Sequence, residues 1–144
     1  MTASERDTLA WNLLFACWVI ALLATLGSLF FSEVMERTPC VLCWYQRIAM
    51  FPLVLIFTVG LFPLDTRCTR YAWPIASAGA LVALYHCLLY LGVLPEGMQT
   101  CTQGVSCADV KIEIYGFLTI PLLSLGSFLL ILALLFGVQK VEKK

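Results

Sequence analysis

Long runs of apolar residues, separated by short polar segments, divide the chain into four parts. Each run has roughly the 20 residues that a helix needs to cross about 30 Å of bilayer hydrocarbon. The runs cover about Trp11–Phe31, Trp44–Phe62, Tyr71–Leu94 and Tyr115–Val138. Because the bilayer core offers no water to the backbone, helices are the expected form, and the alternating segments of a β-barrel are not visible. The pattern predicts an all-α bundle of four transmembrane helices, with residues 1–144 as a single membrane domain.

The composition of the chain agrees with this prediction. Of the 144 residues, 61% are hydrophobic and 12% are charged, whereas ordinary soluble domains have about 45–50% and about 25%. One soluble core of this size could not bury so many apolar residues. Nine basic residues balance nine acidic ones, so composition gives no argument for nucleic-acid binding. The sequence therefore indicates a small integral membrane protein.

The basic residues in the loops, at the termini and at the rim of a span predict the orientation of the chain, because lysine and arginine are enriched in cytoplasmic loops. One side would carry six of them: Arg6, Arg67, Arg70, Lys140, Lys143 and Lys144. The other side would carry three: Arg37, Arg47 and Lys111. We therefore expect both termini on the cytoplasmic side and two loops, Ser32–Cys43 and Pro95–Ile114, facing outward.

Four of the seven cysteines form two close pairs in these two loops. Cys40 and Cys43 make a Cys-x-x-Cys motif in the first loop, and Cys101 and Cys107 make a Cys-x5-Cys motif in the second. Both pairs would face the side on which disulfides persist. Because lysines and arginines alone define the topology, this agreement supports it independently. The remaining cysteines are interpreted as free buried or cytoplasmic thiols: Cys17, Cys68 and Cys87.

The local setting of the Cys-x-x-Cys motif favours redox chemistry. Thr38 and Pro39 are typical of a helix start, as N-cap and first helical residue. Cys40 and Cys43 would then lie in the first turns, where free N–H groups and the positive end of the helix dipole favour a thiolate. Arg47 would lie one turn further on the same face and add positive charge. Alternatively, Arg47 only extends its charge to the headgroups.

The single histidine, His86, is the other polar candidate inside an apolar run. It would lie about 12 Å below the outer end of the third span. A cationic Arg47, a neutral imidazole and a nearby thiolate could line one pocket for the polar head of a lipid-soluble quinone. The alternative for His86 is a hydrogen bond to a carbonyl or hydroxyl group of a neighbouring helix.

The sequence Pro-Cys-Val-Leu-Cys-Trp-Tyr-Gln-Arg over residues 39–47 resembles the signature of the bacterial DsbB family of quinone-linked thiol oxidases. Four spans with a cysteine pair in each outward loop are also similar to that family. The second half is similar to the BdbC-type branch, because its Cys-x5-Cys loop is short and Tyr-Gly-Phe-Leu-Thr-Ile-Pro opens the fourth span.

This resemblance implies a membrane enzyme, a quinone-dependent protein-disulfide oxidoreductase. Such an enzyme reoxidises a soluble, thioredoxin-like thiol oxidase similar to DsbA or BdbD and passes the electrons to ubiquinone or menaquinone. It would support disulfide bond formation in exported proteins from the bacterial inner membrane. Cys101 would form the mixed disulfide with the partner, and Cys107 would exchange with Cys40.

The resemblance also implies roles for the residues at the rim of the membrane. Cys40 and Cys43 would be the pair that quinone oxidises, with Cys43 as the thiolate that meets the quinone ring. Arg47 would stabilise that charged adduct and the quinone head, and His86 would be a second quinone-binding residue.

Three other interpretations stay open. The four paired cysteines could form a four-thiolate zinc site, although Cys-x5-Cys is a poor second half and Arg47 would add positive charge beside the metal. The chain could be a structural bundle with disulfide-stapled loops and no turnover. The same chemistry could also act on a small quinone-like substrate, as in the vitamin K epoxide reductases, but a fifth span is absent.

Overall fold

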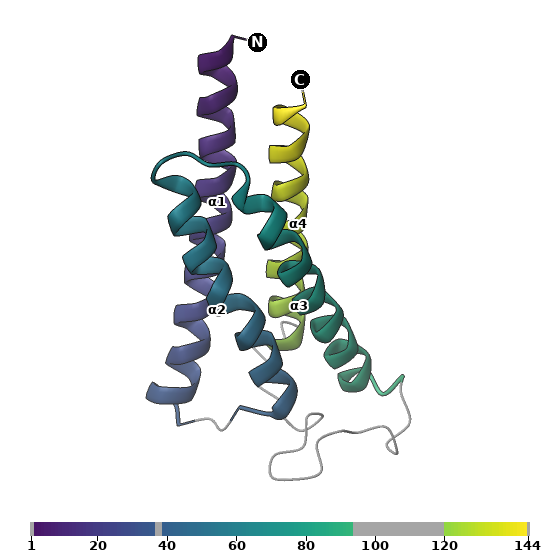
Figure 1. The fold of residues 1–144 in the computed structure, drawn as a ribbon. Coiled ribbons are helices and arrows are strands. Elements are labelled where there is room, and N and C mark those ends of the chain that lie inside the picture. Colours follow the sequence, from purple (N-terminus) through teal and green to yellow (C-terminus); the bar gives the residue numbers. More distant parts are fainter. Residues whose placement is uncertain (1, 37–38, 94–119, 144) are drawn as a thin grey trace.

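The computed structural model describes residues 2–36, 39–93 and 120–143. In these residues the chain forms four long helices, α1 (Ala3–Leu29), α2 (Val41–Leu61), α3 (Cys68–Tyr90) and α4 (Ile120–Glu142), and a π-helical turn, η1 (Phe30–Val34), continues α1 (Figure 1). All four helices are long and apolar enough to cross a membrane. The predicted all-α bundle of four spans is confirmed.

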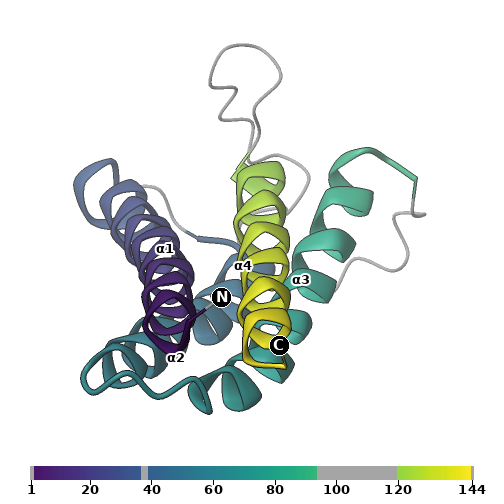
Figure 2. The ribbon, with the colours of Figure 1, turned by 90° about the horizontal axis from the view of Figure 1, so that it is seen from above.

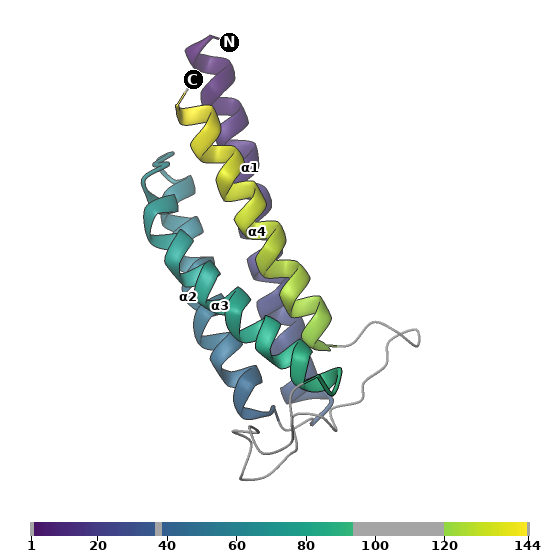
Figure 3. The ribbon, with the colours of Figure 1, turned by 90° about the vertical axis from the view of Figure 1, so that its right-hand side faces the viewer.

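Successive helices run in opposite directions, and each packs on two neighbours, α1 on α2, α2 on α3, α3 on α4 and α4 on α1 (Figure 2). Both termini lie at one end of the bundle, and α2 begins with Cys40 and Cys43 at the opposite end (Figures 1 and 3). Cys101, Cys107 and the predicted start of the fourth span at Tyr115 lie outside the described residues. The end of α3 and the start of α4, which flank them, lie at the same end as Cys40.

Helices α1 and α4 extend beyond the apolar runs that predicted them. α1 begins at Ala3, eight residues before the predicted start at Trp11, because Thr2 and Glu5 form a capping box. The backbone N–H of Glu5 donates to Thr2 Oγ1 at 3.3 Å, and that of Thr2 donates to Glu5 Oε2 at 2.6 Å. α4 likewise continues to Glu142. Hydropathy therefore located the spans, and capping set the helix end.

The start of α2 differs from the sequence prediction. The helix begins at Val41 with Cys40 as its N-cap, so the prediction of Pro39 as first helical residue is wrong; Thr38, predicted as N-cap, lies outside the described residues. The sulfur of Cys40 accepts the backbone N–H of Cys43 at 3.3 Å, as a hydroxyl or carboxylate oxygen does in an ordinary N-cap. The thiol of Cys40, a group capable of redox chemistry, therefore also caps the N-terminus of α2.

α3 ends at Tyr90, four residues before the predicted end at Leu94. Gly92 has a positive φ of 70°, and the N–H groups of Gly92 and Val93 donate back to the last turn, which is a Schellman motif. His86 is therefore four residues, or about 6 Å, from the helix end, and the predicted depth of about 12 Å is wrong.

Small residues on α3 allow α4 to approach closely, as in many membrane bundles. Five of them are buried: Ala72, Ala76, Gly79, Ala80 and Ala83. The ring of Phe128 from α4 is fully buried and lies against Gly79, where an added Cβ would overlap it. On the outside, large apolar side chains such as Leu55 and Phe136 are more than half exposed, as lipid contact requires.

We expect Gly79→Ala to destabilise the bundle by about 1–3 kcal/mol, because the new methyl group overlaps the Phe128 ring. Thermal unfolding of the purified protein in detergent measures the effect. Gly126→Ala is the matched control, since nothing lies within 4 Å of a Cβ at Gly126 and alanine favours a helix over glycine. An equal loss in both variants would contradict this account of the packing.

Candidate active site

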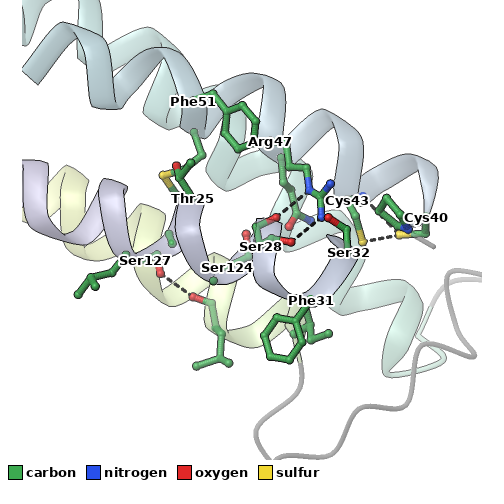
Figure 4. A pocket seen from close by; sticks show the side chains of 18 residues that line it. Thr25, Ser28, Phe31, Ser32, Cys40, Cys43, Arg47, Phe51, Ser124 and Ser127 are labelled. Atoms are coloured by element: carbon green, nitrogen blue, oxygen red, sulfur yellow. Dashed lines mark hydrogen bonds between the residues drawn. The ribbon is translucent and has the colours of Figure 1, made fainter. Parts of the chain in front are cut away.

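Cys40 and Cys43 form a close sulfur pair at the start of α2. The N-cap and the third helical residue lie on one face of the first turn, and here their Sγ atoms are 2.7 Å apart (Figure 4). Cys40 is 3% exposed, whereas Cys43 is partly exposed. A disulfide bond is about 2.0 Å long, so the pair needs only a small side-chain movement to form one when an oxidant removes two electrons and two protons.

The surroundings of Cys40 favour its thiolate. The nearest hydrogen-bonding partner of Cys40 Sγ is Cys43 Sγ. Nε2 of His86 lies 3.9 Å from Cys40 Sγ, and the backbone N–H of Cys43 donates to the same sulfur. Together, with the Cys43 sulfur first, these groups hold the pKa of Cys40 well below its usual range. Of the two thiols, Cys40 is therefore the one whose deprotonation the surroundings favour.

His86 is 1% exposed and lies between α3 and α2. Its Nδ1 is 3.0 Å from Nε2 of Gln46, and its Nε2 faces Cys40. The ring thus contacts a neighbouring helix through a side-chain amide. His86 is not among the residues that line the cavity described next, and its predicted contact with quinone stays a prediction.

A cavity of about 260 Å³ opens beside the two sulfurs, between α1, α2 and α4 (Figure 4). Its wall is mostly apolar and includes Leu23, Phe31, Met50 and Phe51. Five hydroxyl groups add polar points: Thr25, Ser28, Ser32, Ser124 and Ser127. Cys40, Cys43, Gln46 and Arg47 complete the wall on the side of α2. The cavity can hold a flat, mostly apolar molecule that has a few polar atoms.

Arg47 places a positive charge in this cavity. Its side chain is 9% exposed, Nε donates to Ser28 Oγ and Nη2 donates to the Ser28 carbonyl, both at 2.7 Å (Figure 4). The guanidinium carbon lies 5.4 Å from the ring centroid of Trp44. Arg47 has no carboxylate partner among the residues described. A buried guanidinium that donates two hydrogen bonds to Ser28 differs from one that extends to the lipid headgroups.

The structure brings together four of the six predicted site residues: Cys40, Cys43, Arg47 and His86. Cys101 and Cys107 lie outside the described residues. Gln46 and Ser28, which contact His86 and Arg47 respectively, were not among the predicted site residues. Both are polar residues inside apolar runs, which is a signal of function in membrane segments, but nothing in the sequence indicates which residues they contact.

Cys40, Cys43 and His86 could also hold a metal ion. Their ligand atoms all lie within 4.8 Å of one another, and two thiolates with one imidazole suit zinc if a fourth ligand is supplied. This set differs from the four-thiolate site considered from the sequence, of which two cysteines lie outside the described residues.

Comparison with known proteins relates this chain to a family. The family model described as "Disulfide bond formation protein DsbB" matches residues 8–138. A "Probable disulfide formation protein" of Metapseudomonas resinovorans is 41% identical over 137 residues, which are 94% of this chain and 95% of the relative. "Disulfide bond formation protein C" of Bacillus subtilis (strain 168) is 47% identical over 119 residues, 83% of this chain and 86% of the relative. No solved structure matches the chain.

Proposed function

The chain belongs to the DsbB family of disulfide bond formation proteins, and from this premise we propose that Cys40 and Cys43 pass electrons to a quinone bound in the neighbouring cavity. The protein is a multi-pass membrane protein and a disulfide oxidoreductase. Quinone-linked reoxidation of a thiol oxidase is the role of this family.

The observation that carries the proposal is a dithiol on the wall of an apolar cavity that also holds a buried arginine. The donor set fits a quinone head, because Arg47 can donate to carbonyl oxygens and the apolar wall suits the ring. Thr25 Oγ1, also on the wall, is buried without a hydrogen-bond partner among the described residues, so a polar ligand could satisfy it. A bound quinone would accept two electrons and two protons.

The residues of the chain would divide the work as follows. Oxidation of the pair forms the Cys40–Cys43 sulfur–sulfur bond and releases two electrons and two protons. Ser28 holds Arg47 in one place, so its positive charge can favour anionic forms at the cavity. The site is at the rim of the bundle, which suits a lipid-dissolved acceptor better than a soluble protein.

We assign contact with the partner to the second pair. In this assignment a thiolate of the partner attacks Cys101 of a Cys101–Cys107 disulfide, and the partner's second thiol then displaces Cys101, so the partner dithiol becomes a disulfide and the Cys101–Cys107 pair is reduced. Cys107 next attacks Cys40 of a Cys40–Cys43 disulfide, which passes the two electrons to that pair. The partner would be a thioredoxin-like thiol oxidase similar to DsbA or BdbD, outside the cytoplasm. The support is that the helix ends flanking residues 94–119 lie at the same end as Cys40 (Figure 1).

The first test uses stopped-flow mixing of the purified protein, a quinone analogue and a reduced thioredoxin-like oxidase. We expect Cys43→Ala to abolish quinone reduction and Cys101→Ala to stop oxidation of the partner. Cys68→Ala, at the other end of the bundle, is the control and should keep full activity. Steady turnover by the Cys43 variant would refute the redox role and leave the metal-binding interpretation, in which the variant loses bound zinc instead.

The second test concerns Arg47. We expect Arg47→Ala to raise KM for quinone about tenfold, equivalent to about 1.4 kcal/mol, while KM for the partner stays unchanged. Ser28→Ala should change KM in the same direction by less, because it frees the guanidinium without removing its charge. Arg70→Ala, at the opposite end of the bundle, is the charge-matched control. An unchanged KM in the Arg47 variant would favour an arginine that only reaches the headgroups.

The third test concerns orientation, for which we propose termini in the cytoplasm and both cysteine pairs outside, in a bacterial inner membrane. A membrane-impermeant thiol reagent applied to intact, reduced spheroplasts should label Cys101. Cys68, near the α2–α3 connection, should react only after the membrane is permeabilised. The reverse result would place the cysteine pairs in the cytoplasm, where disulfides are rare, and would contradict the proposed orientation.

A further inference from the structure

Gln46 has no assigned role, yet it lies between the cavity and the sulfur pair. It is 7% exposed and lines the cavity, and its Nε2 is 3.0 Å from Nδ1 of His86. The opposite nitrogen of the same ring, Nε2, faces Cys40 Sγ at 3.9 Å. One buried ring therefore connects an amide on α2 with the sulfur of the N-cap of the same helix, six residues or about 1.7 turns earlier.

The chemistry of the amide determines which ring nitrogen carries a proton. The Nε2 of glutamine has only hydrogens to offer, so the ring nitrogen beside it must accept. Nδ1 of His86 then has a free lone pair, and the proton of the neutral imidazole is on Nε2, directed toward Cys40. The other tautomer would place two hydrogen atoms between Gln46 and the ring and two electron pairs between the ring and a Cys40 thiolate.

From this geometry we propose that Gln46 is a positioning residue that fixes His86 as the Nε2–H tautomer, so that the ring donates a hydrogen bond to the thiolate of Cys40. The ring keeps its own proton throughout; it acts as a donor and takes no proton from the thiol. For its consequence in turnover, this inference rests on the proposed function, in which Cys40 is one of the two exchanging sulfurs.

Other charged and titratable groups are present around this cluster, and they are identical in any two samples below that differ only at Gln46. Cys43 and Arg47 come from α2, and Tyr85 from α3 packs against the group of Cys40 and its buried neighbours. On η1, Glu33 accepts a hydrogen bond from Ser32, which lines the cavity, and the residues of α4 on the cavity wall are all neutral. A difference between wild type and a variant at Gln46 is therefore caused by the loss of the Gln46 amide.

The tautomer can be observed directly because His86 is the only histidine of the chain. Isotope-labelled histidine in the full-length protein, reduced and in detergent, gives the nuclear magnetic resonance signals of one ring without assignment. We expect a neutral ring protonated on Nε2 at neutral pH, and Gln46→Leu should lose this preference. A wild-type ring protonated on Nδ1, or on both nitrogens, would overturn the proposal even if the Gln46 variant does not fold.

The effect on Cys40 is measured by ultraviolet absorbance of the thiolate during a pH titration. Cys43→Ala is the background in every sample, and the difference from a second sample that also carries Cys40→Ser isolates Cys40. We expect Gln46→Leu to raise the apparent pKa of Cys40 by about one unit, so about tenfold less thiolate remains at a pH below that value. An unchanged titration would contradict the proposal.

A double-mutant cycle separates positioning from simple packing. If Gln46 acts through the ring, Gln46→Leu should change the Cys40 titration when His86 is present and have no further effect when His86→Phe is already made. Equal effects in both backgrounds would overturn the proposal. None of these measurements involves quinone or a partner, so failure of turnover with a confirmed tautomer would reject the proposed function alone.

Discussion

The site depends on one requirement of helix α2, which begins at the rim of an apolar bundle and needs acceptors for its first N–H groups. Cys40 meets this requirement with its sulfur. The same N-cap geometry fixes Cys43 three residues later, with its sulfur 2.7 Å from that of Cys40. Capping the helix, stabilising a thiolate and holding a dithiol within bonding range are therefore three results of a single local conformation.

A second constraint is the charge of Arg47 in an environment of low dielectric. A carboxylate partner would neutralise the guanidinium and weaken its field in the cavity. Ser28 instead accepts two hydrogen bonds through neutral groups, its hydroxyl and its carbonyl. The charge is thus held in place and remains available, because α1 supplies dipoles and no counter-charge. The cavity next to Cys43 is consequently both apolar on most of its wall and positive at one point.

Hydropathy and helical spacing predicted the four spans and the motif on α2, whereas the exact helix ends and the contacts between helices were not predicted. Hydropathy located four spans, and helical spacing placed Arg47 near Cys43. The start of α1 and the end of α3 depend on local signals, Thr2 with Glu5 and Gly92, which an average over an apolar run overlooks. The contacts of Ser28 with Arg47 and of Gln46 with His86 join different helices. They depend on how the helices pack, which the spacing of residues along the sequence does not reveal.

Gln46 connects the cavity with the sulfur pair. Its side chain belongs to the cavity wall and at the same time contacts His86, which faces Cys40. A ligand in the cavity that competed for the amide would weaken the contact with His86 and with it the stabilisation of the Cys40 thiolate. By linkage, the state of the sulfur pair would change the affinity for that ligand by the same factor. An enzyme that must release a reduced acceptor and admit an oxidised one gains from such coupling, because the sulfur pair has a different charge at each of these steps.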